Sequence, residues 1–245
     1  TCALPISLAY LHIALNGNNT QFYVKHLLID EMQDYSPIQY KVIQKLYPCR
    51  KTILGDASQS VNPYGSSTAD MIQKVFTTGE IMKLCKSYRS TFEITSFAQK
   101  IQPNNELEPI MRHGEHPRVL QFRNTEEEIQ SLADLVSSFK SSHYTSLGII
   151  CKTESQAKEL AQKLQPYTDC ISLLSNQSST YIKGIIITSA HMAKGLEFDE
   201  VIIPQADDKN YHSSTDKSML YVAVTRAMHQ LTLTYSGPLH ICRFL

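Results

Sequence analysis

Two adjacent carboxylates, Asp30 and Glu31, follow a short apolar run near the start of the sequence. They stand in the segment LLIDEMQDYSP, residues 27–37, in which Pro37 is typical of the first position of a helix. Neighbouring acids at the end of a strand suit Mg²⁺, which takes one or two carboxylates together with phosphate oxygens. One acid could hold the metal while the other positions or deprotonates a water that attacks a γ-phosphate. The alternative is a solvated acidic turn with a polar cap ahead of the helix.

A second polar loop follows another apolar run, in KTILGDASQSVNPY, residues 51–64. Gly55 permits a tight turn where the strand would end. The amide of Gln59 can both donate and accept hydrogen bonds, which suits contact with a γ-phosphate or with the attacking water. The alternative is an ordinary polar loop with a helix cap.

The 245-residue chain has a globular composition, with 42% hydrophobic and 19% charged residues. It contains 23 basic and 23 acidic residues, so any surface for a polyanion must be a local basic patch. Its six cysteines include no C-x-x-C pair, which argues against a disulfide framework or zinc site and favours a reduced, cytoplasmic setting. His113 and His116 form an HxxH, but nothing else nearby resembles a zinc site. The apolar runs are too short to span a membrane, so we expect no membrane partner.

Short β-branched runs alternate with segments of helical periodicity, which is typical of an α/β fold with a parallel sheet. The predicted strands cover residues 25–29, 51–54, 81–84, 118–122, 146–151, 171–174, 184–188, 200–203 and 231–235. The clearest amphipathic helices cover residues 125–140, 154–164 and 217–228. Thr125 and Glu128 have the spacing of a capping box at the start of the first of these helices. Residues 102–117, rich in Pro, Asn, His and Glu, predict a connection.

Five segments, in order, resemble the motifs of UvrD/Rep-type superfamily-1 DNA helicases. DEMQD, LGDASQS and KSYRST are similar to motifs II, III and IV of that family. TSAHMAKGLEFDEVIIP, residues 188–204, and LYVAVTRAMHQLTL, residues 220–233, are similar to motifs V and VI. Single motifs are weak signals, but five in register are a strong one. The resemblance implies a RecA-like (P-loop NTPase) parallel-sheet architecture with ATP bound between two lobes, a partial first lobe at residues 1–85 and a complete second lobe at residues 86–245.

The resemblance implies a role for each matched residue of the nucleotide site. Asp30 and Glu31 match the acids that bind Mg²⁺ and activate water, and Gln59 matches the glutamine that contacts the γ-phosphate. Arg89 in SYRS and Arg226 in VTRA match two arginines that reach the γ-phosphate from the second lobe. A planar, permanently charged guanidinium stabilises the charge that develops during phosphoryl transfer. On the residues alone, a surface ion pair is the alternative for each arginine.

Four further residues take roles from the same resemblance. Tyr88 is similar to the tyrosine that stacks on the adenine base, and Glu197 to the glutamate that hydrogen-bonds the ribose. His191 and Lys194 lie in AHMAKGLEF, a segment that the family places near single-stranded DNA. The alternatives are a core aromatic for Tyr88, an interior histidine for His191 and a solvated side chain for Lys194.

The sequence departs from the family in three places. It contains no Gly-Lys dipeptide and hence no phosphate-binding loop G-x-x-x-x-G-K-[ST], so this chain alone is predicted not to hydrolyse ATP. That loop lies upstream of the acidic motif in the family, and the chain begins without an initiator Met, so we expect a missing N-terminal part. The chain has no Trp, and Tyr64 would have to replace the family's DNA-stacking tryptophan. The short interval between Arg89 and His191 leaves little room for the family's 2B domain.

Three functional hypotheses follow. The first is the C-terminal part of an ATP-dependent DNA helicase or translocase that uses ATP and Mg²⁺ to move on single-stranded DNA. The second is a HelD-type ATPase that remodels or recycles RNA polymerase, which the lost aromatic residues and the short interval favour. The third is a non-catalytic docking module. Against it stands the joint presence of Asp30, Glu31, Gln59, Arg89 and Arg226.

Overall fold

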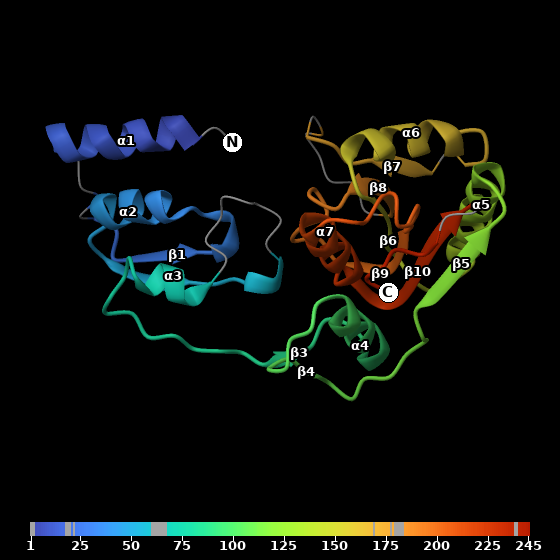
Figure 1. Ribbon diagram of the computed structural model, residues 1–245, viewed down its shortest axis with the longest axis horizontal. Coiled ribbons are helices and arrows are strands. Elements are labelled where there is room, and N and C mark those ends of the chain that lie inside the picture. Colours follow the sequence, from blue (N-terminus) through green and yellow to red (C-terminus); the bar gives the residue numbers. More distant parts are fainter. Residues whose placement is uncertain are drawn as a thin grey trace. The chain divides into compact units, whose positions relative to one another are not determined.

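The computed structural model describes residues 3–17, 21, 23–59, 68–168, 170–176, 178, 184–237 and 240–245. The chain divides into two compact units, Thr1–Lys83 and Leu84–Leu245. Their helices and strands are labelled in Figure 1. Within the described parts, no helix combines the length and the apolar character that crossing a membrane requires.

The first unit is a small α/β assembly around two parallel strands. Its elements are α1 (Ala3–Asn16), β1 (His26–Ile29), α2 (Pro37–Leu46), β2 (Arg50–Ile53) and α3 (Ala69–Gln73). The strands pair in parallel, with His26 opposite Arg50 and Ile29 opposite Ile53. Short 3₁₀ turns follow each strand, at Met32–Asp34 and Ala57–Gln59. The two polar loops predicted from the sequence therefore begin at the same edge of one sheet.

Tyr40, on α2, anchors the turn that follows β1. Its ring is fully buried, with Ile29, Ile72 and Val75 in the same small core. Its hydroxyl donates a hydrogen bond of 2.8 Å to the carbonyl oxygen of Met32. Burial, together with the nearby Tyr35 and Asp34, raises the pKa of the Tyr40 hydroxyl well above its ordinary value. The hydroxyl therefore stays protonated and keeps the turn attached to the core.

The second unit is built on a six-stranded sheet in which every paired strand runs parallel. The strand order is β5-β10-β9-β6-β8-β7. These strands are β5 (Arg118–Phe122), β6 (Leu147–Cys151), β7 (Ile171–Leu173), β8 (Ile185–Ser189), β9 (Phe198–Ile203) and β10 (Ala227–Ser236). A separate short pair, β3 (Lys86–Ser87) and β4 (Glu108–Pro109), precedes the sheet in the chain. The helices are α4 (Phe92–Ile101), α5 (Thr125–Lys140), α6 (Glu154–Leu164) and α7 (Ser214–Val224).

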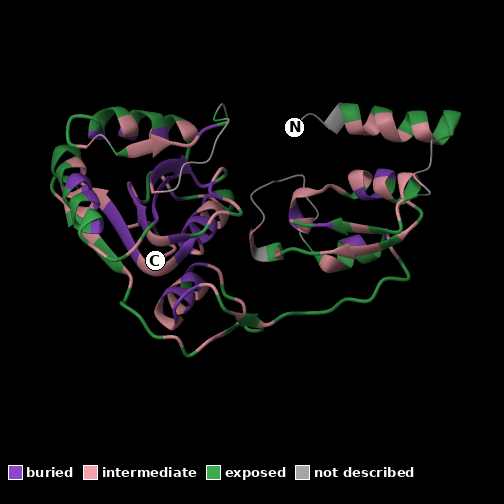
Figure 2. Cartoon of the chain, turned by 180° about the vertical axis from the view of Figure 1, so that it is seen from behind, coloured by how far each residue is buried: buried purple, intermediate pink, exposed green. Residues whose placement is uncertain are grey.

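Helices cover both faces of this sheet, and its central strands are buried (Figure 2). Ile186 packs with α4 and α7 on one face, while its neighbours Ile185 and Ile187 pack with α5 and α6 on the other. This alternation is what the period of two along a strand requires. Gly148 on β6 has no room for a side chain, because a Cβ there would lie 2.6 Å from a ring carbon of Phe198.

Most predicted elements are confirmed, and three predictions are wrong. Residues 81–84 form no strand; the chain there has no regular structure until β3. The helix predicted over residues 217–228 is α7, which ends at Val224 and is followed by a turn into β10. Thr125 and Glu128 form no capping box, because Asn124 is the residue that caps α5. Glu128 is instead buried, and its carboxylate accepts hydrogen bonds from the hydroxyl of Thr234 and the backbone N–H of Gln205.

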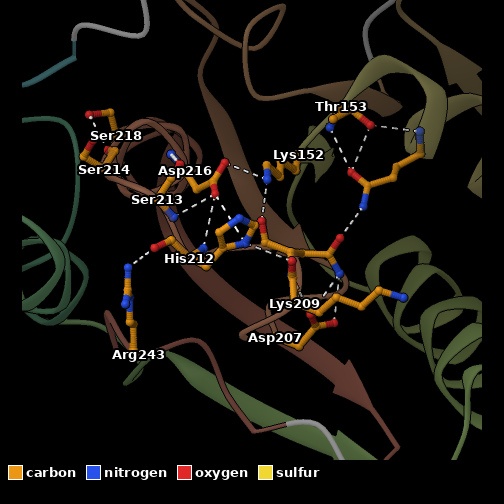
Figure 3. Close-up of polar contacts among 12 residues, drawn as sticks. Lys152, Thr153, Asp207, Lys209, His212, Ser213, Ser214, Asp216, Ser218 and Arg243 are labelled. Atoms are coloured by element: carbon orange, nitrogen blue, oxygen red, sulfur yellow. Dashed lines mark hydrogen bonds and ion pairs between the residues drawn. The ribbon is translucent and has the colours of Figure 1, made fainter.

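A largely buried ion pair fixes the start of α7 relative to the end of β6 (Figure 3). Lys152 Nζ lies 2.6 Å from Asp216 Oδ1 and also donates to the carbonyl oxygen of Asn210. The other carboxylate oxygen of Asp216 accepts hydrogen bonds from the backbone N–H groups of His212 and Ser213. Burial raises the pKa of Asp216, but the hydrogen bonds from Lys152, Ser213 and His212 outweigh it and lower the pKa below its ordinary value.

We expect this ion pair to make folding stability sensitive to acid. Because the folded-state pKa of Asp216 is lowered, its contribution is fully present above the unfolded-state value of about 3.9 and is lost as the pH falls below it. Asp216→Asn leaves Lys152 without its counter-ion and should reduce the free energy of unfolding by about 3 kcal/mol at pH 7. The deficit relative to the unchanged protein should shrink below about pH 4. Denaturant unfolding over a pH series measures both effects.

The matched control is Glu159→Gln, which breaks an ion pair with Lys163 in which both side chains are largely exposed. An exposed pair of this kind contributes less than about 1 kcal/mol. Equal losses for the two variants would show that the Lys152–Asp216 pair does not stabilise the fold.

Candidate active site

The first half of the candidate site lies at the carboxyl edge of the β1–β2 pair. The backbone N–H of Leu54 donates to the carbonyl of Ile29, and the N–H of Met32 donates to the carbonyl of Leu54, each at 2.8 Å. These bonds extend the pairing past both strand ends. They hold Asp30 and Glu31 beside the loop that contains Gln59. Ligands of open parallel sheets gather at this edge.

Gln33, a residue for which the sequence predicts no role, joins the two loops. Its side chain is fully buried. The amide nitrogen donates a hydrogen bond of 2.6 Å to Glu31 Oε2. The amide oxygen accepts a hydrogen bond of 3.1 Å from the backbone N–H of Asp56. Asp56 in turn accepts a hydrogen bond of 3.0 Å from the side-chain amide of Gln59. Glu31 and Gln59 thus belong to one hydrogen-bonded series. Its only signal in the sequence was the Q of DEMQD.

The backbone at this edge is constrained at two positions. Glu31 has φ 55° and ψ 51°, a left-handed conformation that is uncommon for a residue with a side chain. Gly55 lies so close to the opposite loop that a Cβ would stand 2.5 Å from Gln33 Oε1 and 2.6 Å from the backbone nitrogen of Met32. This close approach, and not a left-handed turn, is why a glycine follows β2.

The carboxylates of this edge differ in exposure. Asp30 is exposed, and its Oδ1 accepts a hydrogen bond of 2.8 Å from the backbone N–H of Glu31. Glu31 is half-buried and oriented by Gln33. One carboxylate is therefore accessible to a bound ion, while the other is held in one orientation by the buried amide. Such an arrangement suits a metal ligand beside a proton acceptor.

The second half of the candidate site gathers Arg89, Glu197 and Arg226 within the second unit. Arg89 Nε lies 2.6 Å from Glu197 Oε1, an ion pair that remains partly exposed. The residues flanking Glu197 are fixed to Arg226, because the N–H of Phe198 donates to the Arg226 carbonyl and Arg226 Nη1 donates to the Leu196 carbonyl. The structure thus brings together residues from the three segments that resemble motifs IV, V and VI.

Arg226 is a buried cation, with 1% of its surface exposed. Its guanidinium donates to the carbonyls of Val222 and Leu196 and to the hydroxyl of Thr225, at 3.1 to 3.3 Å. A surface ion pair is therefore the wrong alternative for Arg226, whereas Arg89 does form one with Glu197. Arginine stays protonated when it is buried, so Arg226 can offer a fixed positive charge to an anion.

The remaining predicted site residues lie as follows. Tyr88 follows β3 and is 67% exposed, so the core alternative is wrong. His191 is exposed and not interior, and Lys194 is half-buried; both lie on the turn after β8. Tyr64 lies outside the described residues. His113 lies 2.8 Å from a carboxylate oxygen of Glu93, and the described residues contain no group of three or more potential metal-binding side chains.

Comparison with known proteins identifies the class. The family profile of the UvrD/REP helicase N-terminal domain matches residues 14–78, and that of the UvrD-like helicase C-terminal domain matches residues 167–237. A solved structure, the C-terminal domain of a possible DNA helicase from Lactobacillus plantarum, is 30% identical with a TM-score of 0.55. That match covers 64% of this chain and 91% of the solved one. These matches place the chain in a helicase family, and its sheet has the RecA-like α/β fold that the sequence predicts.

Relatives with curated names give the family. The ATP-dependent DNA helicase Rep of Buchnera aphidicola is 28% identical over 130 residues, covering 49% of this chain and 20% of the relative. DNA helicase II of Haemophilus influenzae is 37% identical over 87 residues, covering 33% and 12%. Rep of Escherichia coli is 27% identical over 118 residues, covering 44% and 18%. The chain belongs to the UvrD/Rep-type superfamily-1 helicases. It spans at most about a fifth of the length of these relatives.

Proposed function

We propose that this chain supplies two parts of the ATP-hydrolysing site of a DNA helicase or translocase. The proposal rests mainly on one observation: Glu31 and Gln59 share a hydrogen-bonded series, and Arg89, Glu197 and Arg226 share another. Motif residues that are far apart in the sequence are therefore assembled within each unit. A set of solvated turns and unrelated surface ion pairs would not require this arrangement.

The residues of the first unit fit the chemistry of phosphoryl transfer. Asp30 and Glu31 offer the hard oxygen ligands that Mg²⁺ takes together with nucleotide phosphates, and the ion would neutralise charge on those phosphates when bound. Glu31, held by Gln33, positions a water and accepts its proton. The amide of Gln59 contacts the γ-phosphate or that water.

The residues of the second unit act on the same nucleotide. Arg89 and Arg226 stabilise the negative charge that spreads over the γ-phosphate oxygens during transfer. The exposed ring of Tyr88 stacks on the adenine base. Glu197 hydrogen-bonds the ribose, and its carboxylate has two oxygens, of which Oε1 pairs with Arg89 Nε.

The two units correspond to two RecA-like lobes. ATP hydrolysis is coupled to movement of the protein along single-stranded DNA. His191 and Lys194 contact this strand, and Tyr64 stacks on one of its bases. The exposure of His191 and the names of the relatives, all DNA helicases, support DNA as the partner.

Hydrolysis of ATP by the natural protein at its full length tests this function. We expect Mg²⁺-dependent turnover that single-stranded DNA stimulates. The 245-residue chain alone should show negligible turnover, because it has no G-x-x-x-x-G-K-[ST] loop. Absence of turnover in the full-length protein, with and without DNA, would contradict the proposal.

The second candidate is a HelD-type ATPase that acts on RNA polymerase with the same site. The absence of Trp in the chain favours it, because a base-stacking residue is then lacking unless Tyr64 serves. Capture of core RNA polymerase by the full-length protein, without stimulation of ATP turnover by single-stranded DNA, would select this candidate over the first.

A further inference from the structure

Arg112 lies outside every segment that resembles a helicase motif, in the connection between α4 and β5. Its side chain is half-buried. Nη2 donates one hydrogen bond to the backbone carbonyl of Arg89 and another, of 3.3 Å, to the backbone carbonyl of Met228. One guanidinium nitrogen therefore joins the chain at Arg89 to the chain two residues beyond Arg226.

Backbone contacts on both sides place Arg112 where it can do this. The N–H of Phe92 donates a hydrogen bond of 2.8 Å to the Arg112 carbonyl, and the N–H of Thr91 donates one of 3.2 Å to the Met228 carbonyl. The hydroxyl of Ser90 donates 2.6 Å to the Ala227 carbonyl. The segment after Arg89 is thus hydrogen-bonded to the start of β10 at several positions. Arg112 adds a further contact from a third segment of the chain.

The residues after Arg112 hold that third segment on the start of α4. Glu93 accepts hydrogen bonds of 2.8 Å from the ring of His113 and from the backbone N–H of Gly114. These bonds lower the pKa of Glu93 to about 2, so the carboxylate is ionised at neutral pH. Gly114 also approaches Thr91 closely, because a Cβ there would lie 2.7 Å from the Thr91 methyl group. The position of Arg112 is therefore set by more than its own side chain.

A purely structural role explains Arg112 poorly. Within the described residues, the Arg112 guanidinium forms no salt bridge with a carboxylate. Its Nε is buried and has no hydrogen-bond partner. Burying a charged group with an unsatisfied donor costs free energy. Both acceptors of Arg112 are carbonyls beside the two arginines of the candidate site. The free-energy cost of the buried Nε is explained if Arg112 serves to position those two arginines.

We propose that Arg112 is a positioning residue that sets the backbone of Arg89 relative to that of Arg226, so that both guanidinium groups meet one γ-phosphate. This inference rests on the proposed function, in which both arginines act on the phosphate. Arg112 does not itself touch the nucleotide. A displacement of about 1 Å at a reacting group lowers a rate by up to roughly 100-fold.

ATP turnover of the full-length protein carrying Arg112→Ala tests the inference. We expect kcat to fall by roughly 10- to 100-fold, with little change in KM for ATP, because the misplaced arginine acts chiefly in the transition state. In a protein that already carries Arg89→Ala, adding Arg112→Ala should cost less than about 2-fold, since its target is gone. Arg123→Ala, at an exposed position in the same region of the chain, is the control and should leave kcat unchanged.

The outcomes separate the inference from the function on which it rests. If Arg89→Ala leaves turnover unchanged, the proposed function fails. If Arg89→Ala lowers turnover but Arg112→Ala behaves like Arg123→Ala, or if the two losses multiply, the positioning role is overturned. If Arg112→Ala does not fold, Arg112→Lys replaces it; a lysine reaches fewer acceptors than the guanidinium, so kcat should fall several-fold. Unchanged kcat for Arg112→Lys in that case also overturns the role.

Discussion

Replacing Arg226 by alanine is expected to lower ATP turnover by the full-length protein about 10³-fold or more, the effect of removing an arginine finger. The reason is electrostatic: the guanidinium is buried, permanently charged and held by hydrogen bonds to the carbonyls of Val222 and Leu196, so little reorganisation is needed when charge develops on the phosphate. Steady-state hydrolysis at saturating ATP, with and without single-stranded DNA, measures the loss.

Loss of packing must be separated from loss of catalysis in this experiment. Arg226 also joins the end of α7 to the segment before β9, through Val222 and Leu196. We therefore expect some loss of thermal stability in Arg226→Ala. Arg226→Lys keeps the charge but not the planar fork, and should remain folded with turnover well below normal. Normal turnover by a folded Arg226→Ala protein would show that hydrolysis does not depend on Arg226. It would support the hypothesis that this chain serves only as a docking module.

Glu31→Gln should lower ATP turnover by about 10²- to 10⁴-fold, the usual contribution of a general base. Glutamine has nearly the shape of glutamate but cannot accept the proton of the attacking water. Since Gln33 donates to Glu31 Oε2, the new side chain can keep this contact through its own amide oxygen. Nucleotide binding should therefore persist, and a fluorescent ATP analogue would show an affinity within a few-fold of normal.

Glu80→Gln is the matched control in the first unit, because Glu80 is exposed and outside both polar loops. It should hydrolyse ATP at the normal rate. The assignment of Glu31 as the proton acceptor is wrong if Glu31→Gln also retains normal kcat. Loss of both turnover and nucleotide binding would indicate a role in binding alone.

The sequence predicts best those helices in which the helical repeat of apolar residues stops at the residue where the helix ends. The helices predicted at residues 125–140 and 154–164 match α5 and α6. Each begins after a polar capping residue, Asn124 or Thr153, and each ends where its repeat of apolar residues ends. The helix at residues 217–228 was predicted too long. The apolar pattern of LYVAVTRAMHQLTL runs on into β10, whereas hydrogen bonds from Thr225 and Arg226 to the Val222 carbonyl close the helix.

The site residues could be predicted only where a short motif carries them. Gln33 and Arg112 have roles that come from partners far away in the chain, Asp56 and Met228, and no local pattern reveals such contacts. Glu128 shows the converse. Its spacing from Thr125 favoured a capping box, but the fold places it beside Thr234, where a buried hydroxyl offers a stronger partner.

Hydrogen exchange tests most directly whether the two hydrogen-bonded sets act on one nucleotide. The full-length protein would be compared with and without Mg²⁺, ADP and aluminium fluoride, which together mimic the transferring phosphate. We expect slower exchange in both polar loops of the first unit, residues 30–35 and 55–59, and also in residues 88–91 and 225–228 of the second. Protection confined to one unit, with the nucleotide bound, would contradict it.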